Sequence, residues 1–439
     1  HIEMLAKHSS NYIHAPYWQA AIAPKKTEAS INHRDLPKRA DTVIVGGGYT
    51  GISAAITLAR AGQKVVVFEA DAFGNGASSR NGGMLGPSFS KLGENGLERQ
   101  YGREQVHATI RESLAAFNWL VDFIRNEQID CDLQICGRFR GASHPAHYAG
   151  LIEQASEIAK IVDFPAIEIS RTQQGDEVGS NAYYGGVVYP TDGAVHPAKL
   201  FHGLCEIAKR DGALLFDHSP VRQVIKNNSQ FNISIDDKKI TADHVIIATN
   251  GYTGGPFGKF KRRLIPIRSA MIATEELPES VIRSVSPKLR CHGSTERLSV
   301  YYRPSPDGKR ILFGGRSLGY GDCPQIYHKY LQDFMTRLFP QLSNAKLDYV
   351  WSGKIAYTFD HVPHIGVMDG MHYAMGYCGS GVGRANYFGR KIAQKVLDQA
   401  EGYTIFEEFP FKTRPFYTGH PWFLPAIMKW HSLADRLGF

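Results

Sequence analysis

The sequence of 439 residues lacks the features that mark membrane, secreted and zinc-binding proteins. No apolar run reaches the roughly 18 residues of a membrane-spanning helix, and the N-terminus lacks the basic and then apolar pattern of a signal peptide. The six cysteines lie far apart with no CxxC pair, which argues against a disulfide framework or a zinc site. These absences predict a cytoplasmic protein in a reducing compartment, with Met4 as its natural start.

A strong charge of one sign is also missing. The net charge of +8 is modest for this length, and the densest basic run, KFKRR at 259–263, is typical of a solvated loop. His361 and His364 form an HxxH pair, but Pro363 between them disfavours a helix and no third ligand is evident. The sequence therefore predicts neither a nucleic-acid partner nor a metal site.

Glycine, in contrast, is concentrated in GGGYTG at 46–51, between the apolar run TVIV and a helix-like segment. TVIV and KVVVFE (64–69) are typical of strands buried on both faces. In this strand–helix–strand context Gly46 permits the tight turn, Gly48 leaves room for a pyrophosphate and Gly51 allows close packing of helix and sheet. Glu69 can accept both ribose hydroxyls and disfavours a 2′-phosphate. The motif predicts a dinucleotide site without choosing between NAD and FAD.

A second glycine-rich turn, GNGASSRNGG at 74–83, follows the second strand and brings the Arg80 guanidinium near the same ligand. Together with GGVVYPTDGAVHPAKL, ADHVIIATNGYT and GYCGSGVGRANYFGRKIA, it makes residues 40–400 similar to the FAD-dependent amine and amino-acid oxidase family. That family includes D-amino-acid oxidase, glycine oxidase and sarcosine oxidase. GASSRNGG resembles in particular the γ-glutamylputrescine oxidase branch.

The resemblance implies where FAD lies. Glu69 would hold the adenosine ribose, the Val221 backbone would contact the adenine, and Thr249 would lie near the phosphates. The Ser78–Met84 loop would pass under the isoalloxazine ring, and the turn Gly379–Gly383 would face its pyrimidine carbonyls, where a helix N-terminus stabilises reduced flavin. The expected cofactor residues are Gly46, Gly48, Tyr49, Thr50, Gly51, Glu69, Ala70, Gly76, Ala77, Ser78, Arg80, Asn81, Gly82, Gly83, Met84, Val221, Thr249, Gly379, Ser380, Gly381, Val382 and Gly383.

Strand and helix patterns alternate in three separate stretches, 40–90, 186–255 and 350–400, which we assign to a discontinuous FAD-binding domain. Residues 91–185 and 256–349 then form a substrate domain, and residues 1–39 a lead-in draped over the surface. The predicted fold class is α/β, or α+β overall: a Rossmann-like FAD-binding domain and a second domain that contains a mostly antiparallel sheet.

The C-terminal tail, 401–439, is unusually aromatic and contains an amphipathic helix. Ile427, Trp430, Leu433 and Leu437 share one face of it. This helix is expected to dock on its own protein or on a second subunit, with contact to a membrane surface as the alternative. The sequence leaves the oligomeric state open.

Several positions depart from the family's pattern. Ile355 stands where sarcosine oxidases carry the cysteine that binds flavin covalently, so FAD is expected to be non-covalent. Leu312 replaces their oxygen-activating lysine, which leaves both O₂ and another electron acceptor open. The arginine that clamps a substrate carboxylate near position 355 is absent, and Ser380 replaces a common histidine. These differences favour an amine whose carboxylate, if it has one, is distant from the reacting carbon.

The resemblance implies oxidation of a primary or secondary amine, polyamine-derived or similar to a γ-glutamyl amine. A hydride would pass to flavin N5, and the imine would then hydrolyse. The expected substrate-pocket residues are Tyr301, Tyr302, Tyr357, Arg316, Arg268 and Ser380, and one of the two adjacent tyrosines should face the ring. One alternative is an FAD-dependent oxidase or dehydrogenase of an N-methyl or cyclic amino acid. The other is a non-catalytic nucleotide-binding or RNA-modification module.

Overall fold

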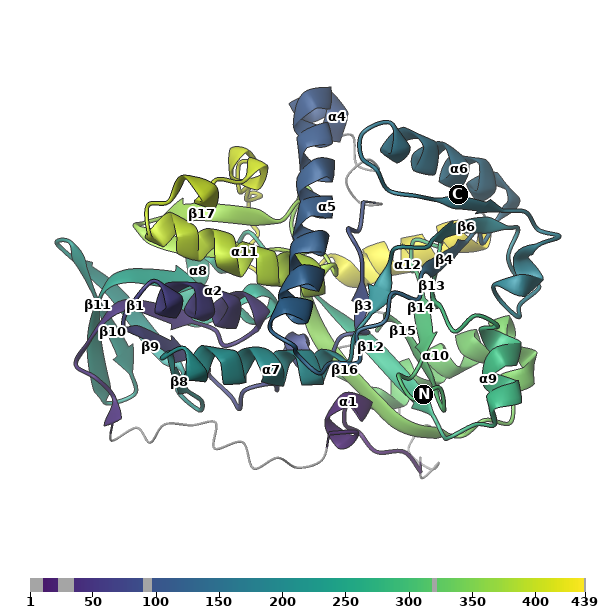
Figure 1. Ribbon diagram of the computed structural model, residues 1–439, viewed down its shortest axis with the longest axis horizontal. Coiled ribbons are helices and arrows are strands. Elements are labelled where there is room, and N and C mark those ends of the chain that lie inside the picture. Colours follow the sequence, from purple (N-terminus) through teal and green to yellow (C-terminus); the bar gives the residue numbers. More distant parts are fainter. Residues whose placement is uncertain (1–10, 23–34, 90–96, 318–321, 438–439) are drawn as a thin grey trace.

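The buried apolar runs form a mainly parallel sheet in the computed structural model, which describes residues 11–22, 35–89, 97–317 and 322–437. β1 (Arg39–Val45) lies between β11 (Lys238–Ile247) and β2 (Val65–Phe68). The sheet continues to β8 (Leu214–Phe216) on one side and to β18 (Met371–Met375) and antiparallel β17 (His364–Met368) on the other. The hairpin β9 (Val221–Asn227) and β10 (Gln230–Ile235) extends β11. This half confirms the expected Rossmann-like arrangement (Figure 1).

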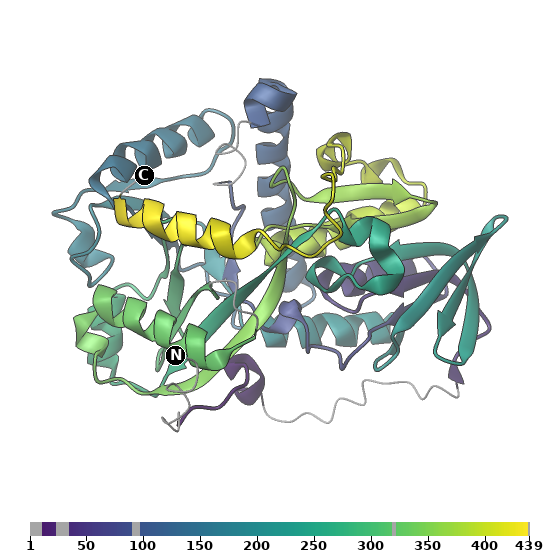
Figure 2. The ribbon, with the colours of Figure 1, turned by 180° about the vertical axis from the view of Figure 1, so that it is seen from behind.

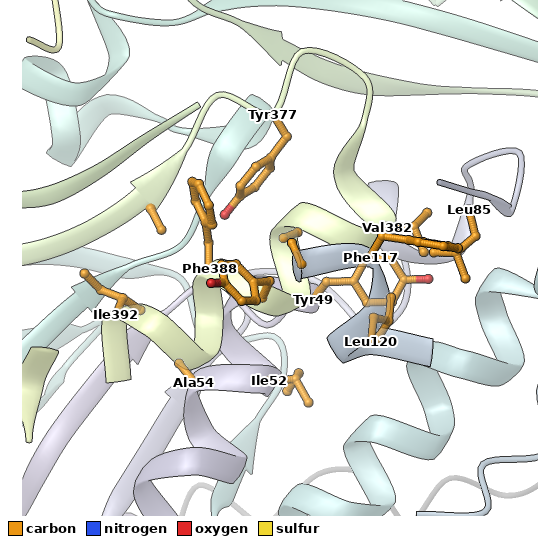
Figure 3. Close-up of a cluster of buried hydrophobic side chains, with 14 of the residues drawn as sticks. Tyr49, Ile52, Ala54, Leu85, Phe117, Leu120, Tyr377, Val382, Phe388 and Ile392 are labelled. Atoms are coloured by element: carbon orange, nitrogen blue, oxygen red, sulfur yellow. The ribbon is translucent and has the colours of Figure 1, made fainter. Parts of the chain in front are cut away.

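Four helices accompany this sheet: α2 (Tyr49–Arg60), α5 (Arg103–Asn126), α7 (Pro197–Arg210) and α11 (Gly381–Val396). Ile52 of α2, Leu120 of α5 and Phe388 of α11 belong to one fully buried cluster (Figure 3). Burying each such side chain contributes about 1.5–3 kcal/mol. The packing places α5 with the half built on the mainly parallel sheet, although the sequence assigned all of 91–185 to the substrate domain. The apolar periodicity of the sequence predicts the helix, but it does not show which elements the helix packs against.

The second half is built on a sheet that is antiparallel except for one parallel pair. Its order is β16 (Leu347–Tyr357), β12 (Ile265–Thr274), β15 (Ile311–Arg316), β14 (Tyr301–Pro304), β13 (Cys291–Ser294), β4 (Arg138–Gly141), β6 (Gly186–Tyr189) and β5 (Ile167–Ile169). Helices α6 (Pro145–Ala159), α9 (Glu279–Val285) and α10 (Pro324–Leu338) belong to this half (Figure 1). The sheet includes β6 and β16, so the expected boundaries at 186 and 350 do not follow the strand pairing.

Shorter elements complete the described chain. β3 (Met84–Leu85) pairs with β7 (Gly193–Ala194) to form a separate two-stranded sheet. The short α-helices are α1 (Tyr17–Ala20), α4 (Leu97–Tyr101) and α8 (Gly258–Lys261). Among the described residues, no helix is long and apolar enough to cross a membrane.

The N-terminal segment is anchored rather than draped over the surface. Trp18 of α1 is fully buried, in a cluster with Met271, Leu312 and Trp351. Its indole N–H donates to the Asn81 carbonyl oxygen at 2.8 Å, which satisfies the one polar group of the side chain. The expectation of a surface lead-in is therefore wrong for α1, because the large aromatic side chain of Trp18 packs into the core and holds this segment in place.

The C-terminal tail forms the expected helix, α12 (Leu424–Leu437), which crosses the second half of the molecule (Figure 2). Leu424 and Met428 pack on Leu298. The Asp435 carboxylate accepts hydrogen bonds from the backbone amides of Arg297, at 2.7 Å, and Leu298, at 3.0 Å. One face of α12 thus docks on its own chain, but it is not the apolar face that the sequence predicted, because Ile427, Trp430 and Leu433 are exposed.

Candidate active site

A cavity of about 1260 Å³ is lined by residues of both sheets. One half of its lining comes from the ends of β1 and β2 and from the first turns of α2 and α11. The other half comes from β12, β14, β16 and α12. Typical small-ligand pockets occupy about 300–1,000 Å³, so this cavity has room for a dinucleotide together with a second small molecule.

The glycine turn at 46–51 leaves no room for a side chain at Gly46 or at Gly51. Gly46 has a φ of +105°, and a Cβ there would lie 2.5 Å from the Ala248 carbonyl oxygen. A Cβ on Gly51 would lie 1.9 Å from the carbonyl oxygen of Gly46, so α2 packs directly on the turn. Gly48 is the N-cap residue of α2 and lines the cavity. The turn therefore presents a helix N-terminus to the cavity, which is favourable for phosphate.

Glu69 directly follows β2 and is held by the same turn. Its carboxylate accepts hydrogen bonds from the amides of Gly47, at 2.9 Å, and Asp71, at 3.1 Å. Burial raises the pKa of the Glu69 carboxyl, and these amide hydrogen bonds oppose the rise. Glu69 also lines the cavity, as expected for a carboxylate that accepts ribose hydroxyls.

The loop at 74–84 is fixed by both halves of the molecule. Asn81 Oδ1 accepts from the Gly83 amide at 2.8 Å, while Arg80 donates to the carbonyl oxygens of Asn75, at 2.8 Å, and Ser352, at 3.1 Å. The indole N–H of Trp351 donates to the Arg80 carbonyl oxygen at 2.8 Å. Arg80 thus orders the loop in addition to lining the cavity, and the ordered loop forms one wall of the cavity.

The turn before α11 brings a second helix N-terminus to the cavity. Cys378 and Gly379 both have left-handed backbone angles, with φ of +55° and +87°. Ser380 is the N-cap residue of α11 and makes no side-chain cap. Ser380, Gly381, Val382 and Gly383 line the cavity. A positive dipole end is thereby available to a group that gains negative charge.

Aromatic and polar side chains of the second sheet line the other half of the cavity. The Tyr301 and Ser269 hydroxyls share a hydrogen bond of 2.9 Å, and a Tyr301 ring carbon lies 3.0 Å from where a Cβ on Gly82 would stand. Arg316 donates to the Tyr357 hydroxyl, and its guanidinium carbon lies 5.2 Å from the centroid of that ring. Burial raises the pKa of Tyr301, so its hydroxyl stays protonated at neutral pH.

The helix α12 covers this second half. Its contributions to the lining, with the residue before it, are Phe423, Leu424, Ile427, Met428 and His431. Burial lowers the pKa of His431, and the positive charge of Arg297 lowers it further, so the imidazole is neutral at neutral pH. This wall is therefore mainly apolar and uncharged.

Comparison with known proteins decides the family. Residues 41–395 match the family described as FAD dependent oxidoreductase, abbreviated DAO. The chain belongs to this family. The glycine turn, Glu69 and the two helix N-termini fit FAD, because they combine a steric cradle, a ribose acceptor and two positive dipole ends.

Individual relatives agree with the family assignment. The chain is 32% identical to the gamma-glutamylputrescine oxidoreductase of Escherichia coli strain K12, over 91% of this chain and 93% of that protein. It is 23% identical to the glycine oxidase of Bacillus licheniformis, over 82% and 94% of the two chains. The crystal structure of glycine oxidase from Geobacillus kaustophilus superposes with a TM-score of 0.71 at 21% identity, covering 86% of this chain and 99% of that one. The expected family and fold class are confirmed.

Nearly all of the residues expected to bind FAD line the cavity. The exception is Gly51, which lies behind the turn, where its lack of a side chain lets α2 approach. The expected members on the lining are Gly46, Gly48, Tyr49, Thr50, Glu69, Ala70, Gly76, Ala77, Ser78, Arg80, Asn81, Gly82, Gly83, Met84, Val221, Thr249, Gly379, Ser380, Gly381, Val382 and Gly383.

The expected substrate residues divide in two. Tyr301, Arg316, Tyr357 and Ser380 line the cavity, whereas Tyr302 and Arg268 do not. Tyr302 is buried in the second core, where its hydroxyl donates to Tyr183 at 3.1 Å. Arg268 donates to the Ser352 hydroxyl at 2.7 Å. Successive side chains of a strand point to opposite faces of the sheet. Tyr301 on β14 and Ser269 on β12 face the cavity, so the adjacent Tyr302 and Arg268 face away from it.

Leu312 also lies away from the cavity lining, in the buried cluster with Trp18 and Met271. The position that the resemblance gives to an oxygen-activating lysine therefore belongs to the core here. Met271 lines the cavity instead, and its terminal methyl lies 3.8 Å from where a Cβ on Gly82 would stand.

Among the contributors to the cavity that the sequence reasoning missed are Ser269, Met271, Glu296 and the inner face of α12. Ser269 and Met271 carry the period-two alternation of a strand, which would have found them had the strand's register been known. Glu296 lies in a loop and carries no periodic signal.

We predict that acid precipitation will release all of the yellow colour into the supernatant. Ile355 lines the cavity at the position that the resemblance gives to the flavin-linking cysteine, and an alkyl side chain has no nucleophilic atom. The described lining contains no cysteine at all. Absorbance spectra of pellet and supernatant after precipitation check this, and colour that stays in the washed pellet would contradict it.

Proposed function

We propose that this FAD-dependent oxidoreductase oxidises a primary or secondary amine, of the polyamine-derived or γ-glutamyl amine kind. The observation that carries the proposal is the similarity to the gamma-glutamylputrescine oxidoreductase, which extends over more than nine-tenths of both chains. The cavity volume of about 1260 Å³ supports it, since it leaves room for a substrate beside the dinucleotide. We further infer that the residues on the nucleotide half hold FAD without a covalent bond.

Bound FAD would supply the hydride acceptor for a C–H bond next to the amine nitrogen. The chain itself would set the protonation of that nitrogen. Arg316 is a permanent cation on the cavity wall, and a like charge nearby lowers the pKa of an ammonium group. Tyr301, being protonated, would position the amine by hydrogen bonding without adding a negative charge. α12 would exclude water from the reacting pair.

Arg316 favours one alternative. A guanidinium beside a tyrosine hydroxyl is also suited to clamp a carboxylate, so oxidation of an N-methyl or cyclic amino acid is the second candidate. In that case the carboxylate lies next to the reacting carbon, whereas in the proposed substrate it is distant.

The proposal is tested by mixing the purified yellow protein with amines in the absence of oxygen. Loss of the flavin absorbance on addition of a γ-glutamyl amine or a polyamine, and not of N-methyl or cyclic amino acids, supports it. The reverse pattern would establish the second candidate in its place.

A further inference from the structure

The loop at 295–300 connects β13 to β14 at the half of the cavity that the second sheet and α12 line, which we call the substrate half. Its ends are tied together, because the Ser294 amide donates to the Val300 carbonyl oxygen at 3.2 Å and the Val300 amide donates to the Ser294 hydroxyl at 3.2 Å. Tyr301 follows directly and lies against the loop that contains Gly82. Glu296 therefore projects from the same hairpin that places Tyr301 in the cavity, and it lines the cavity itself.

Glu296 is the carboxylate of the substrate half. Among the described residues that line the cavity, the acids are Glu69, Asp71 and Glu296. The first two follow β2 at the nucleotide half. A cationic group of a bound substrate thus has one acidic side chain to meet in the described lining of its own half.

One oxygen of this carboxylate has no hydrogen-bond donor. Glu296 Oε2 is buried and has no partner within the part of the chain that the structure describes. Buried carboxylate oxygens are nearly always paired, because an unpaired one loses its hydration without compensation. Because Glu296 lines the cavity, its carboxylate keeps an unsatisfied acceptor beside the space that a ligand would occupy.

We propose that Glu296 binds a second, non-reacting ammonium group of the substrate, the α-ammonium of a distal amino-acid end. This inference rests on the proposed function, and it identifies the residue that recognises the end of the substrate distant from the reacting amine. The described lining of this half also carries the guanidinium groups of Arg138, Arg140, Arg297 and Arg316, which repel a bare cation. An amino-acid end adds a carboxylate that offsets this repulsion, so a zwitterion suits the wall better than a simple diamine.

The tail helix α12 holds Glu296 in position. The Asp435 carboxylate accepts from the backbone amides of Arg297 and Leu298, the two residues that follow Glu296. Leu424 and Met428 pack on Leu298 from the same side. Since α12 lies beyond residues 41–395, this support is added outside the part of the chain that matches the family.

The test is the variant Glu296→Gln, which keeps the size of the side chain and removes its charge. Two matched substrates are compared: a γ-glutamyl diamine and its Nα-acetyl derivative, in which the distal ammonium is absent. We expect the wild-type KM to be about 10- to 100-fold lower for the free ammonium form, the usual range for a charge-assisted hydrogen bond. In Glu296→Gln this ratio should fall to about 1, with kcat changed less than about threefold because the reacting end is untouched.

Exposed Glu153 on α6 provides the control, and Glu153→Gln should retain the wild-type ratio. Isothermal titration of both compounds into the oxidised holoprotein, without oxygen, measures binding independently of turnover. If neither compound reduces the flavin but Glu296→Gln still loses binding of the ammonium form alone, the proposed function fails and this inference stands. An unchanged ratio in Glu296→Gln, or an equal loss for both compounds, would overturn it.

Discussion

Replacing Gly51 by alanine will yield a protein without bound FAD. The new Cβ would lie 1.9 Å from the carbonyl oxygen of Gly46 and 3.1 Å from its carbonyl carbon, and both are backbone atoms that cannot turn aside. Either α2 moves away from β1 or the turn changes its shape. Both shifts displace the helix N-terminus that faces the phosphates. We expect loss of the yellow colour, and a fall in the free energy of unfolding on the scale of an overpacked core, about 1–3 kcal/mol or more, seen as a lower thermal midpoint.

Gly150→Ala is the matched control for this prediction. Gly150 lies on the exposed side of α6, and among the described residues no heavy atom stands within 4 Å of its potential Cβ. Alanine in a helix interior is favoured over glycine by about 0.5–1 kcal/mol, so this variant should remain yellow and at least as stable. The measurements are the ratio of flavin to protein absorbance and the thermal midpoint. A Gly51→Ala protein with a full complement of FAD would contradict the assignment of the turn.

Replacing Arg316 by methionine will shift the pH dependence of flavin reduction by amines. The cation lowers the pKa of the bound ammonium, so its removal raises that pKa and a higher pH is needed to form the reactive neutral amine. We expect the rising limb of the rate profile to move up by about one pH unit or more. At neutral pH the reduction rate should therefore fall about 10-fold and recover in alkaline solution.

Arg268→Met is the control, since Arg268 lies on the neighbouring strand but is turned to Ser352 and Asp322 rather than to the cavity. Its profile should match that of the wild type. Anaerobic stopped-flow reduction across a pH series distinguishes the two candidate functions. If Arg316 clamps a carboxylate, Arg316→Met will raise KM at every pH without moving the rising limb of the rate profile. That outcome would contradict the proposed role of Arg316 in lowering the pKa of the bound ammonium.

The part of the site that follows local rules is predictable from the sequence. The turn at Gly46, the strand that leads to Glu69 and the glycine turn before α11 each combine a short motif with flanking periodicity, and all contribute to the cavity lining. These features depend on neighbours in sequence, so a single chain suffices to recognise them. The order of strands in the second sheet has no such local marker.

Contacts between distant segments are what the sequence conceals. Tyr301 and Tyr302 differ only in the face of β14 that they occupy, which depends on pairing with β13 and β15. Trp18 finds its hydrogen-bond partner at Asn81, and Asp435 finds its partners next to Glu296. The periodicity of the sequence does not predict such partners, because each pair is brought together only by the tertiary fold.

The central claim is that the cavity beside the glycine turn oxidises amines with FAD. The most direct test is anaerobic titration of the yellow protein with a panel of γ-glutamyl amines, polyamines, N-methyl amino acids and cyclic amino acids, followed by flavin absorbance. We predict complete bleaching by a γ-glutamyl amine within the turnover time, partial or slower bleaching by simple polyamines, and none by the amino acids. A protein that carries FAD and is bleached by no amine in the panel would contradict the account.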